Sequence, residues 1–386
     1  MPPLPVQLLQ SGAEYFPALI DAIDRAGREV RLETYIFSDD PTGQRVAEAL
    51  AGAARRGVSV HLVVDGFGTG PLPDPIARTL NDAGVQVRIY SPTVNWLSLN
   101  RDRLRRLHRK LACIDGSIAF VGGINILDDH WDPNHGALDH PRLDYAARVD
   151  GPIAEVVHLE MQALWAQLAQ RPLMRAVDAG KGQVWTLARR FRRRREPAYL
   201  ALRDNVSHRR EIERAYLQAI GRARNEVLIA TAYFFPGRRF RRALREAAGR
   251  GVKVRLLLQG RVEYVLPHRA AQALYDSLMA SGIEVVEYHR SFLHAKVAVI
   301  DDWATVGSSN IDPLSLLLAR EANLVVRDAD FAAELRKRLL LAMEAGGHVI
   351  ADDEQGRRPL WQRAWGWIAY GLLRLGVVVS GERQGY

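Results

Sequence analysis

Short apolar runs alternate with amphipathic segments along the chain. Four apolar runs predict buried strands, at residues 28–37, 58–64, 225–235 and 252–258. Two segments have apolar residues at helical spacing and end in glycine, which predicts helices at residues 43–57 and 237–251. Strands that alternate with helices favour an α/β fold, in which helices flank each sheet.

These elements occur in the same order in both halves, so the chain contains two copies of one unit. The copies differ mainly in one connection. Seventeen residues separate Tyr90 from His108 in the first copy, whereas five separate Tyr288 from His294 in the second. Because the repeat is long, it indicates two related lobes rather than a solenoid.

The repeat and the composition together divide the chain into four parts. We expect an N-terminal lobe at residues 1–170, a basic linker at 171–205, a C-terminal lobe at 206–350, and an amphipathic, membrane-interacting tail at 351–386. The linker has six arginines within residues 189–195. Such a run is typical of a solvated connector, and it is equally typical of a segment that contacts phospholipid headgroups or another polyanion.

One polar cluster is repeated at identical spacing. His108, Lys110 and Asp115 in the first half match His294, Lys296 and Asp301 in the second half. Each cluster is followed by a glycine and, three residues further on, an asparagine. These are Gly122 and Asn125 in the first half, and Gly307 and Asn310, one residue nearer to their cluster, in the second. The chain has only five lysines, and two of them lie in these clusters. A chance origin or general basicity therefore does not explain the pattern.

The spacing places chemically useful groups on one side of a strand. Residues two apart in a strand face the same side, so the histidine and the lysine of each cluster point together, while Arg109 points away. The following turn brings back the asparagine amide, and we expect its glycine to let a ligand approach the backbone. Two such faces that meet would combine two imidazoles, two ammonium groups and two carboxamides in one pocket.

This set of groups suits a phosphate diester. The lysines and asparagines would stabilise charge on the phosphate oxygens. One histidine would attack phosphorus, and the other would protonate the leaving alkoxide and later deprotonate the incoming alcohol. We expect neither a metal nor a cofactor, because the lysines supply the positive charge. Asp115 and Asp301 complete the repeated catalytic motif, but their positions at strand ends favour a structural turn or a salt link over chemistry.

The charge and the cysteine content limit the possible partners and cross-links of the chain. The chain has 53 basic and 44 acidic residues, so its formal net charge is +9. This charge favours an anionic partner, namely nucleic acid, a phosphate ester or an anionic membrane surface. The single cysteine, Cys113, excludes an intramolecular disulfide, and its simplest role is that of a small buried residue.

Targeting signals are weak in this sequence. The N-terminal segment lacks a basic region followed by a continuous apolar core, so we expect no signal peptide. No run of 20 uninterrupted apolar residues occurs, so a conventional membrane span is not evident.

The repeated H-x-K-x4-D motifs resemble those of the phospholipase D superfamily. The resemblance covers nearly the whole chain, and it implies two pseudo-symmetric lobes, each a mixed β-sheet flanked by helices, that share one active site. It also implies a covalent phosphohistidine intermediate, with His108 favoured as the nucleophile. In such enzymes an acidic residue after each motif orients the histidine of that motif, and the candidates by position are Asp144 and Glu321.

Other stretches resemble the bacterial cardiolipin synthases of the shorter type, which lack N-terminal membrane spans. These stretches are residues 33–50, 64–69, 142–157, 203–205 and 232–236. The first copy departs from the superfamily pattern at Gly123, where the second copy has Ser308. Asn125, Ser308 and Asn310 are the candidates that bind the substrate phosphate.

This resemblance implies transfer of a phosphatidyl group from one phosphatidylglycerol to another, with release of glycerol. Phosphatidylethanolamine and free glycerol stay open as further substrates, as does the oligomeric state. The alternatives are a hydrolytic phospholipase D or a nuclease of the same superfamily, and an inactive binding scaffold. Nucleic acid is disfavoured because the aromatic residues cluster near the C-terminus rather than along a basic groove.

Two segments support a location at the membrane. Residues 91–107 combine Trp96, Leu97 and Leu99 with four arginines, which suits a lipid interface and is equally typical of a surface loop. Residues 360–379 have three tryptophans, one tyrosine and two arginines. We favour an interfacial amphipathic helix there over a membrane span or a helix packed on the protein's own core.

Overall fold

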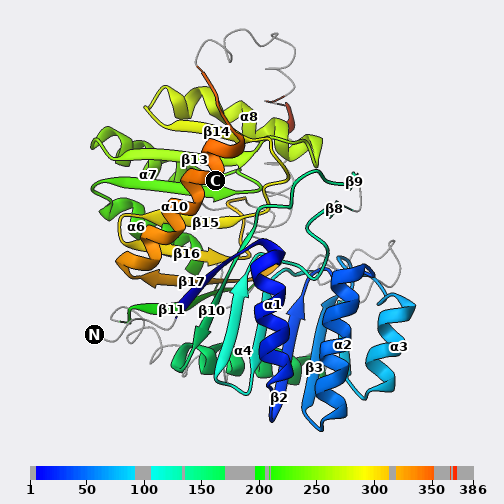
Figure 1. The fold of residues 1–386 in the computed structure, drawn as a ribbon. Coiled ribbons are helices and arrows are strands. Elements are labelled where there is room, and N and C mark those ends of the chain that lie inside the picture. Colours follow the sequence, from blue (N-terminus) through cyan, green and yellow to red (C-terminus); the bar gives the residue numbers. More distant parts are fainter. Residues whose placement is uncertain are drawn as a thin grey trace, which may run out of the picture.

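The protein folds into two lobes, each built on one β-sheet (Figure 1). The computed structural model describes residues 6–91, 106–132, 135–169, 196–204, 208, 210–312, 319–351, 366 and 368–371. The N-terminal lobe contains the predicted strands at 28–37 and 58–64, and the C-terminal lobe contains those at 225–235 and 252–258. The predicted fold class, a two-lobed α/β protein, is therefore confirmed.

The N-terminal sheet is mixed. In spatial order its strands are β1 (Val6–Gln10), β10 (Tyr145–Asp150), β7 (Ile118–Gly122), β6 (Lys110–Ile114), β2 (Glu29–Thr34), β3 (Ser59–Asp65) and β4 (Gln86–Tyr90). Strands β2, β3 and β4 are parallel, and β6 runs antiparallel to β2. The start of β6 therefore lies at the edge of the sheet where the parallel strands end.

The C-terminal sheet repeats this arrangement. Its strands, in spatial order, are β11 (Ala198–Arg203), β17 (Ala319–Arg327), β16 (Trp303–Gly307), β15 (Lys296–Ile300), β12 (Glu226–Thr231), β13 (Lys253–Gln259), β14 (Glu284–Tyr288) and β18 (Gly347–Val349). Strands β12, β13 and β14 are parallel, and β15 runs antiparallel to β12. The two H-x-K motifs therefore occupy equivalent places in the two sheets.

Helices cover the sheets in layers. The outer face of the N-terminal sheet is covered by α1 (Ser11–Asp24), α2 (Pro41–Arg55) and α3 (Asp74–Asp82). The outer face of the C-terminal sheet is covered by α6 (Glu211–Arg222), α7 (Arg238–Gly249) and α8 (Val265–Met279). The helices α4 (Pro152–Ala169) and α10 (Ala329–Gly346) share one core with the inner faces of both sheets. Because this core contains residues of both lobes, burial of apolar surface holds the lobes together.

Main-chain hydrogen bonds also join the lobes. The short strand β5 (Arg106–Leu107) pairs in parallel with β17 of the other lobe, and His108 N donates to Arg320 O at 3.0 Å. On the other side, Leu143 N donates to Phe292 O at 2.9 Å, and His294 N donates to Leu143 O at 2.8 Å. The backbone at each motif histidine is thus fixed to the opposite lobe. A small ribbon of β8 (Trp131–Asp132) and β9 (Gly136–Ala137) lies beside this junction (Figure 1).

One strand lies where the sequence predicts the linker. Residues Ala198–Arg203 form β11, which pairs with β17 along its whole length. The partner strand lies more than a hundred residues further along the chain, so this pairing has no local signal in the sequence.

Asp115 and Asp301 close equivalent hairpin turns at the far ends of β6 and β15. Both have positive φ angles, of 54° and 49°. The carboxylate of Asp115 accepts hydrogen bonds from the backbone N–H groups of Gly27, Arg28 and Glu29 at 2.8–2.9 Å. The carboxylate of Asp301 accepts the equivalent bonds from residues 224–226 at 2.8–3.0 Å. Each aspartate thus ties its hairpin to the start of the neighbouring parallel strand.

Gly122 and Gly307 end the second strand of each hairpin. A Cβ atom at Gly122 would lie 2.5 Å from the Cβ of Ala146, and one at Gly307 would lie 2.3 Å from the Cγ of Asn323. The sequence suggests that these glycines admit a ligand. In the structure the close neighbour is the adjacent strand, β10 or β17, so strand packing accounts for the glycines.

Replacing these glycines should destabilise the protein. Because backbone and side-chain atoms already fill the space, Gly122→Ala and Gly307→Ala should each lower the free energy of unfolding by about 1–3 kcal/mol. Gly221→Ala in α6 is the control, because a Cβ there meets nothing within 4 Å and alanine favours the helix. Thermal denaturation of the three variants tests this, and equal melting temperatures would contradict it.

Removing either turn carboxylate should also destabilise the protein. Asp115→Ala and Asp301→Ala each leave three backbone N–H groups without their acceptor, which should cost about 2 kcal/mol. Chemical denaturation measures the loss. Asp74→Ala, at an exposed pair with Arg78 on α3, is the control and should change stability by less than about 0.5 kcal/mol. A loss at Asp115 or Asp301 no larger than that of the control would show that the turn contacts are unimportant.

Candidate active site

His108 is oriented by a carboxylate from the other lobe. It lies between β5 and β6, and its Nδ1 lies 3.1 Å from Oε2 and 3.0 Å from Oε1 of Glu321 on β17. Glu321 is fully buried, and the hydroxyl of Ser308 donates a hydrogen bond to its Oε2. The hydrogen bond from Ser308 therefore holds the Glu321 carboxylate in the position where it contacts the histidine.

His294 has the equivalent partner in the N-terminal lobe. Its Nδ1 lies 2.6 Å from Oδ2 of Asp144, which immediately precedes β10. The backbone N–H of Tyr145 donates to the other oxygen of Asp144 at 2.8 Å. Asp144 is only 2% exposed, so its charge is held by these contacts and by nearby cations.

The two carboxylate–histidine pairs cross between the lobes. The resemblance implies that each acidic residue orients the histidine of its own motif, and the structure corrects this: Asp144 follows the first motif but holds His294, and Glu321 follows the second but holds His108. A carboxylate that accepts the Nδ1–H leaves Nε2 of a neutral ring unprotonated. Both rings thus direct Nε2 away from their carboxylates, and each histidine side chain is slightly exposed, at 18% and 19%.

The two lysines lie on the same side of their strands as the histidines, as the spacing predicts. Lys110 Nζ donates to the carbonyl of His108 at 2.6 Å, and Lys296 Nζ donates to the carbonyl of His294. Both lysines are buried. Burial lowers the pKa of Lys110 to about 7 and that of Lys296 to about 8, although the carboxylates of Glu321 and Asp144 oppose this effect.

Burial also shifts the pKa values of Asp144 and His294. Burial raises the pKa of Asp144 to about 6, and the charge of Lys296 opposes this rise. Burial lowers the pKa of His294 well below its usual value, and Lys296 and Lys110 lower it further. Interactions of both lysines with both carboxylates show that the two lobes form one electrostatic cluster.

The two asparagines hold equivalent positions beside the cluster. Oδ1 of Asn125 accepts a hydrogen bond from the backbone N–H of Ile36 at 3.2 Å. Oδ1 of Asn310 accepts one from the hydroxyl of Thr231 at 3.4 Å. Since each oxygen is occupied, the amide N–H groups are the donors that remain for a ligand. Asp115 and Asp301 lie at the other ends of β6 and β15, so the structure does not bring them to the histidines.

Three residues of the site have no clear sequence signal. Asp65 Oδ2 accepts a hydrogen bond from Leu107 N at 2.6 Å, and Gln259 Oε1 accepts one from Leu293 N at 3.1 Å. Each is the last residue of one of two equivalent strands, β3 and β13, and fixes the residue before a motif histidine, but their different side chains obscure the repeat. The ring of Tyr35 packs edge-on against His108 with 5.0 Å between ring centroids, and burial raises its pKa to about 12.

Arg109, between the two motif residues, points to the opposite face as predicted. It forms a bidentate ion pair with Glu33 on β2, and both side chains are buried. This pair supports the strand from behind and has no counterpart in the second lobe, where Ala295 takes the place of Arg109.

Several predicted membrane segments lie mainly outside the described residues. These are residues 92–105 of the predicted loop, the arginine run at 189–195, and most of the segment 360–379. Of the last segment, Ala369 is buried with Phe235 and Ala270, and Arg241 donates a hydrogen bond to the hydroxyl of Tyr370 at 3.1 Å. This part therefore packs on the C-terminal lobe. None of the helices that the structure describes is long and apolar enough to cross a bilayer.

Comparison with known proteins agrees with this geometry. Residues 19–138 and 216–340 match the family model described as "Cardiolipin synthase, PLD-like domain", where PLD stands for phospholipase D. The chain is 39% identical to cardiolipin synthase B of Escherichia coli strain K12, over 96% of this chain and 87% of that protein. It is 31% identical to cardiolipin synthase A of Pseudomonas fluorescens, over 90% of this chain and 70% of that protein.

Solved structures share the fold at low sequence identity. The crystal structure of a phosphatidylserine synthase from Haemophilus influenzae superposes with a TM-score of 0.70 and 13% identity, and the match covers 97% of this chain and 95% of that one. A polyphosphate kinase from Porphyromonas gingivalis gives a TM-score of 0.57 over 97% of this chain and 53% of that one. The family match, the full-length relatives and the paired H-x-K motifs lead to one conclusion: the chain belongs to the cardiolipin synthase family of phospholipase D-like proteins.

Proposed function

We propose that the protein is a cardiolipin synthase that transfers a phosphatidyl group from one phosphatidylglycerol to a second one, with release of glycerol. The observation that carries this proposal is the single cluster of two histidines, two lysines and two carboxylates contributed by both lobes. The full-length similarity to proteins named cardiolipin synthase supports the choice of substrate and reaction.

The substrate phosphate is bound by cations and amides. Lys110 and Lys296 face the phosphate oxygens, and the side-chain N–H groups of Asn125 and Asn310 donate to them. Ser308 acts indirectly, because its hydroxyl already donates to Glu321. Since the lysines are buried, their attraction to the phosphate is stronger than it would be in water.

The transfer then proceeds in two steps, formation of a phosphohistidine and transfer of its phosphatidyl group to the acceptor. Nε2 of one histidine, His108 by resemblance, attacks phosphorus, and the bond from phosphorus to the glycerol headgroup breaks while the other histidine donates a proton to the departing oxygen. In the second step, that histidine removes a proton from a hydroxyl of the acceptor phosphatidylglycerol. The hydroxyl oxygen bonds to phosphorus, and the phosphorus–nitrogen bond breaks.

The buried carboxylates support both steps. When a histidine becomes positively charged, its partner Glu321 or Asp144 stabilises the charge and keeps the ring oriented. Burial and the charges of the two lysines keep His294 neutral without substrate, and the negative charge of a bound diester offsets the lysine charges and raises the affinity of His294 for a proton. The protein acts as a peripheral enzyme on an anionic bacterial membrane, a proposal supported by its net charge of +9.

Vesicle assays test the reaction directly. Purified protein incubated with phosphatidylglycerol vesicles should form cardiolipin and glycerol in equal amounts, and His108→Ala and His294→Ala should each reduce the rate by about 10³-fold or more. His158→Gln is the control, because His158 on α4 lies near the turn at Gly116, away from the cluster. Phosphatidic acid as the only product would indicate a hydrolase, and DNA cleavage without lipid turnover would indicate a nuclease.

The depressed lysine pKa values predict a pH dependence of phosphate binding. A phosphodiester keeps one negative charge across neutral pH, so the change in binding comes from groups of the protein. Asp144, with a pKa of about 6, becomes fully negative as pH rises, which acts in the same direction as deprotonation of the lysines. As pH rises from 6 to 9, each lysine passes through its pKa of about 7 or 8 and loses its positive charge. The inhibition constant of soluble glycerophosphoglycerol should therefore rise by about tenfold or more. Lys110→Arg, which stays protonated, should flatten this profile, and a wild-type constant that is independent of pH would refute the prediction.

A further inference from the structure

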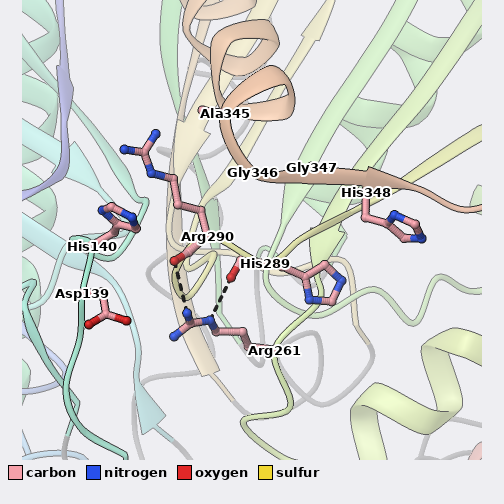
Figure 2. Close-up of a pocket in the computed structure, with 9 residues that line it drawn as sticks. All are labelled: Asp139, His140, Arg261, His289, Arg290, Ala345, Gly346, Gly347 and His348. Atoms are coloured by element: carbon pink, nitrogen blue, oxygen red, sulfur yellow. Dashed lines mark hydrogen bonds between the residues drawn. The ribbon is translucent and has the colours of Figure 1, made fainter.

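A second cationic pocket lies at the junction of the lobes (Figure 2). Its volume is about 670 Å³, within the range of small-molecule sites. Asp139 and His140 line it from the N-terminal lobe. The C-terminal lobe contributes Arg261, which follows β13, the pair His289 and Arg290, which follows β14, and residues 345–348 at the end of α10. None of these residues belongs to the catalytic cluster.

Arginine and histidine side chains dominate the pocket. Arg261 donates from Nε to the carbonyl of His289 at 2.9 Å and from Nη2 to the carbonyl of Arg290 at 3.2 Å, as the dashed lines in Figure 2 show. Arg261 thus braces the segment that carries Arg290. The guanidinium of Arg290 has no hydrogen bond or ion pair with the residues that the structure describes, and the residue is exposed. It is available to an anionic ligand.

The acidic groups nearby do not cancel this charge. Asp139 lines the opposite wall (Figure 2). Glu287 is buried outside the lining, where it lies 3.4 Å from Nε2 of His289 and accepts a hydrogen bond from the hydroxyl of Tyr275. The lining therefore contains two guanidinium groups and one carboxylate, and the histidines add hydrogen-bond donors. An anion that also has hydroxyl groups would suit both walls.

The pocket is linked through the backbone to the catalytic pair His294 and Asp144. Two chain segments run side by side from one to the other, residues 140–144 and 290–294. They are joined by the hydrogen bond from the hydroxyl of Ser291 to the carbonyl of His140 at 2.7 Å and by the parallel bridge between Leu143 and Leu293. Four residues of extended chain span at most about 14 Å, so Arg290 lies within that distance of His294 along the backbone.

We propose that this pocket binds the phosphodiester of the acceptor phospholipid. The inference rests on the proposed function, because that reaction brings together two anionic lipids. The buried lysines are committed to the phosphate that reacts, so the phosphate of the second lipid needs another cation within reach of the cluster. Arg290 and Arg261 provide it, and the carboxylate of Asp139 accepts a hydrogen bond from one glycerol hydroxyl of the headgroup, which leaves the other hydroxyl for the transfer.

A donor with a chromogenic leaving group separates donor cleavage from acceptor binding. Phosphatidyl-4-nitrophenol in mixed micelles releases nitrophenol when the histidine is loaded, and phosphatidylglycerol is then added at increasing concentration. With Arg290→Gln we expect nitrophenol release without acceptor to stay within twofold of the wild-type rate. The phosphatidylglycerol concentration that gives half-maximal cardiolipin formation should rise about tenfold, and more phosphatidic acid should form from water.

Two variants serve as controls. Arg290→Lys keeps the charge and should retain most of the acceptor affinity. Arg245→Gln removes an exposed arginine from α7, which contributes nothing to the pocket lining, and should match the wild-type protein.

The outcomes distinguish the two proposals. An acceptor titration that is identical for Arg290→Gln and the wild-type protein, alongside normal cardiolipin formation, would overturn the acceptor site and leave the proposed function intact. A wild-type protein that releases nitrophenol but never forms cardiolipin would overturn the proposed function, and the acceptor site with it. If inorganic phosphate binds in a manner that depends on Arg290 but the acceptor titration is unchanged, the pocket is a free-phosphate site and the acceptor proposal is wrong.

Discussion

The crossed carboxylate–histidine pairs are the interaction on which the rest of the site depends. Each imidazole is oriented by a carboxylate of the opposite lobe, so neither lobe alone contains an oriented histidine. The carboxylates and lysines are buried, and removing any one of these charges would leave its partners uncompensated in a medium of low polarity. The shared apolar core between the sheets and the backbone bonds at His108 and His294 hold the lobes in the register that these pairs require.

The two lobes surround their histidine-orienting carboxylates with different side chains. In the second lobe, Ser308 donates to the carboxylate of Glu321. In the first lobe, Gly123 takes the equivalent place, and a Cβ there would lie 2.4 Å from Oδ1 of Asp144. The departure of Gly123 from the superfamily pattern thus has a steric reason, because the Asp144 carboxylate occupies the space that a serine side chain would need.

Sequence alone predicts the parts of the site that repeat. The strand pattern and the duplicated H-x-K spacing correctly place the two lysines at equivalent positions of the two sheets, although each histidine lies two residues before its strand. The crossed pairing could not be predicted, because it depends on how the lobes pack. Asp65 and Gln259 accept equivalent hydrogen bonds but are different residue types, and Tyr35 has no equivalent in the second half. Comparing the halves of the sequence therefore does not reveal these three residues. Strand β11 lies where the sequence predicts the linker, and its pairing with β17 leaves no local signal because the two strands are distant in the sequence.

The crossed pairing can be measured by ¹⁵N NMR of the histidine rings in Asp144→Asn and Glu321→Gln variants, with signals assigned from His108→Gln and His294→Gln. Ring nitrogen shifts report the tautomer and its hydrogen bond. The structure predicts that Asp144→Asn changes the ring signals of His294 and leaves those of His108 nearly unchanged, and that Glu321→Gln does the reverse. A change at the histidine of the same motif, with the other ring unaffected, would contradict the shared site.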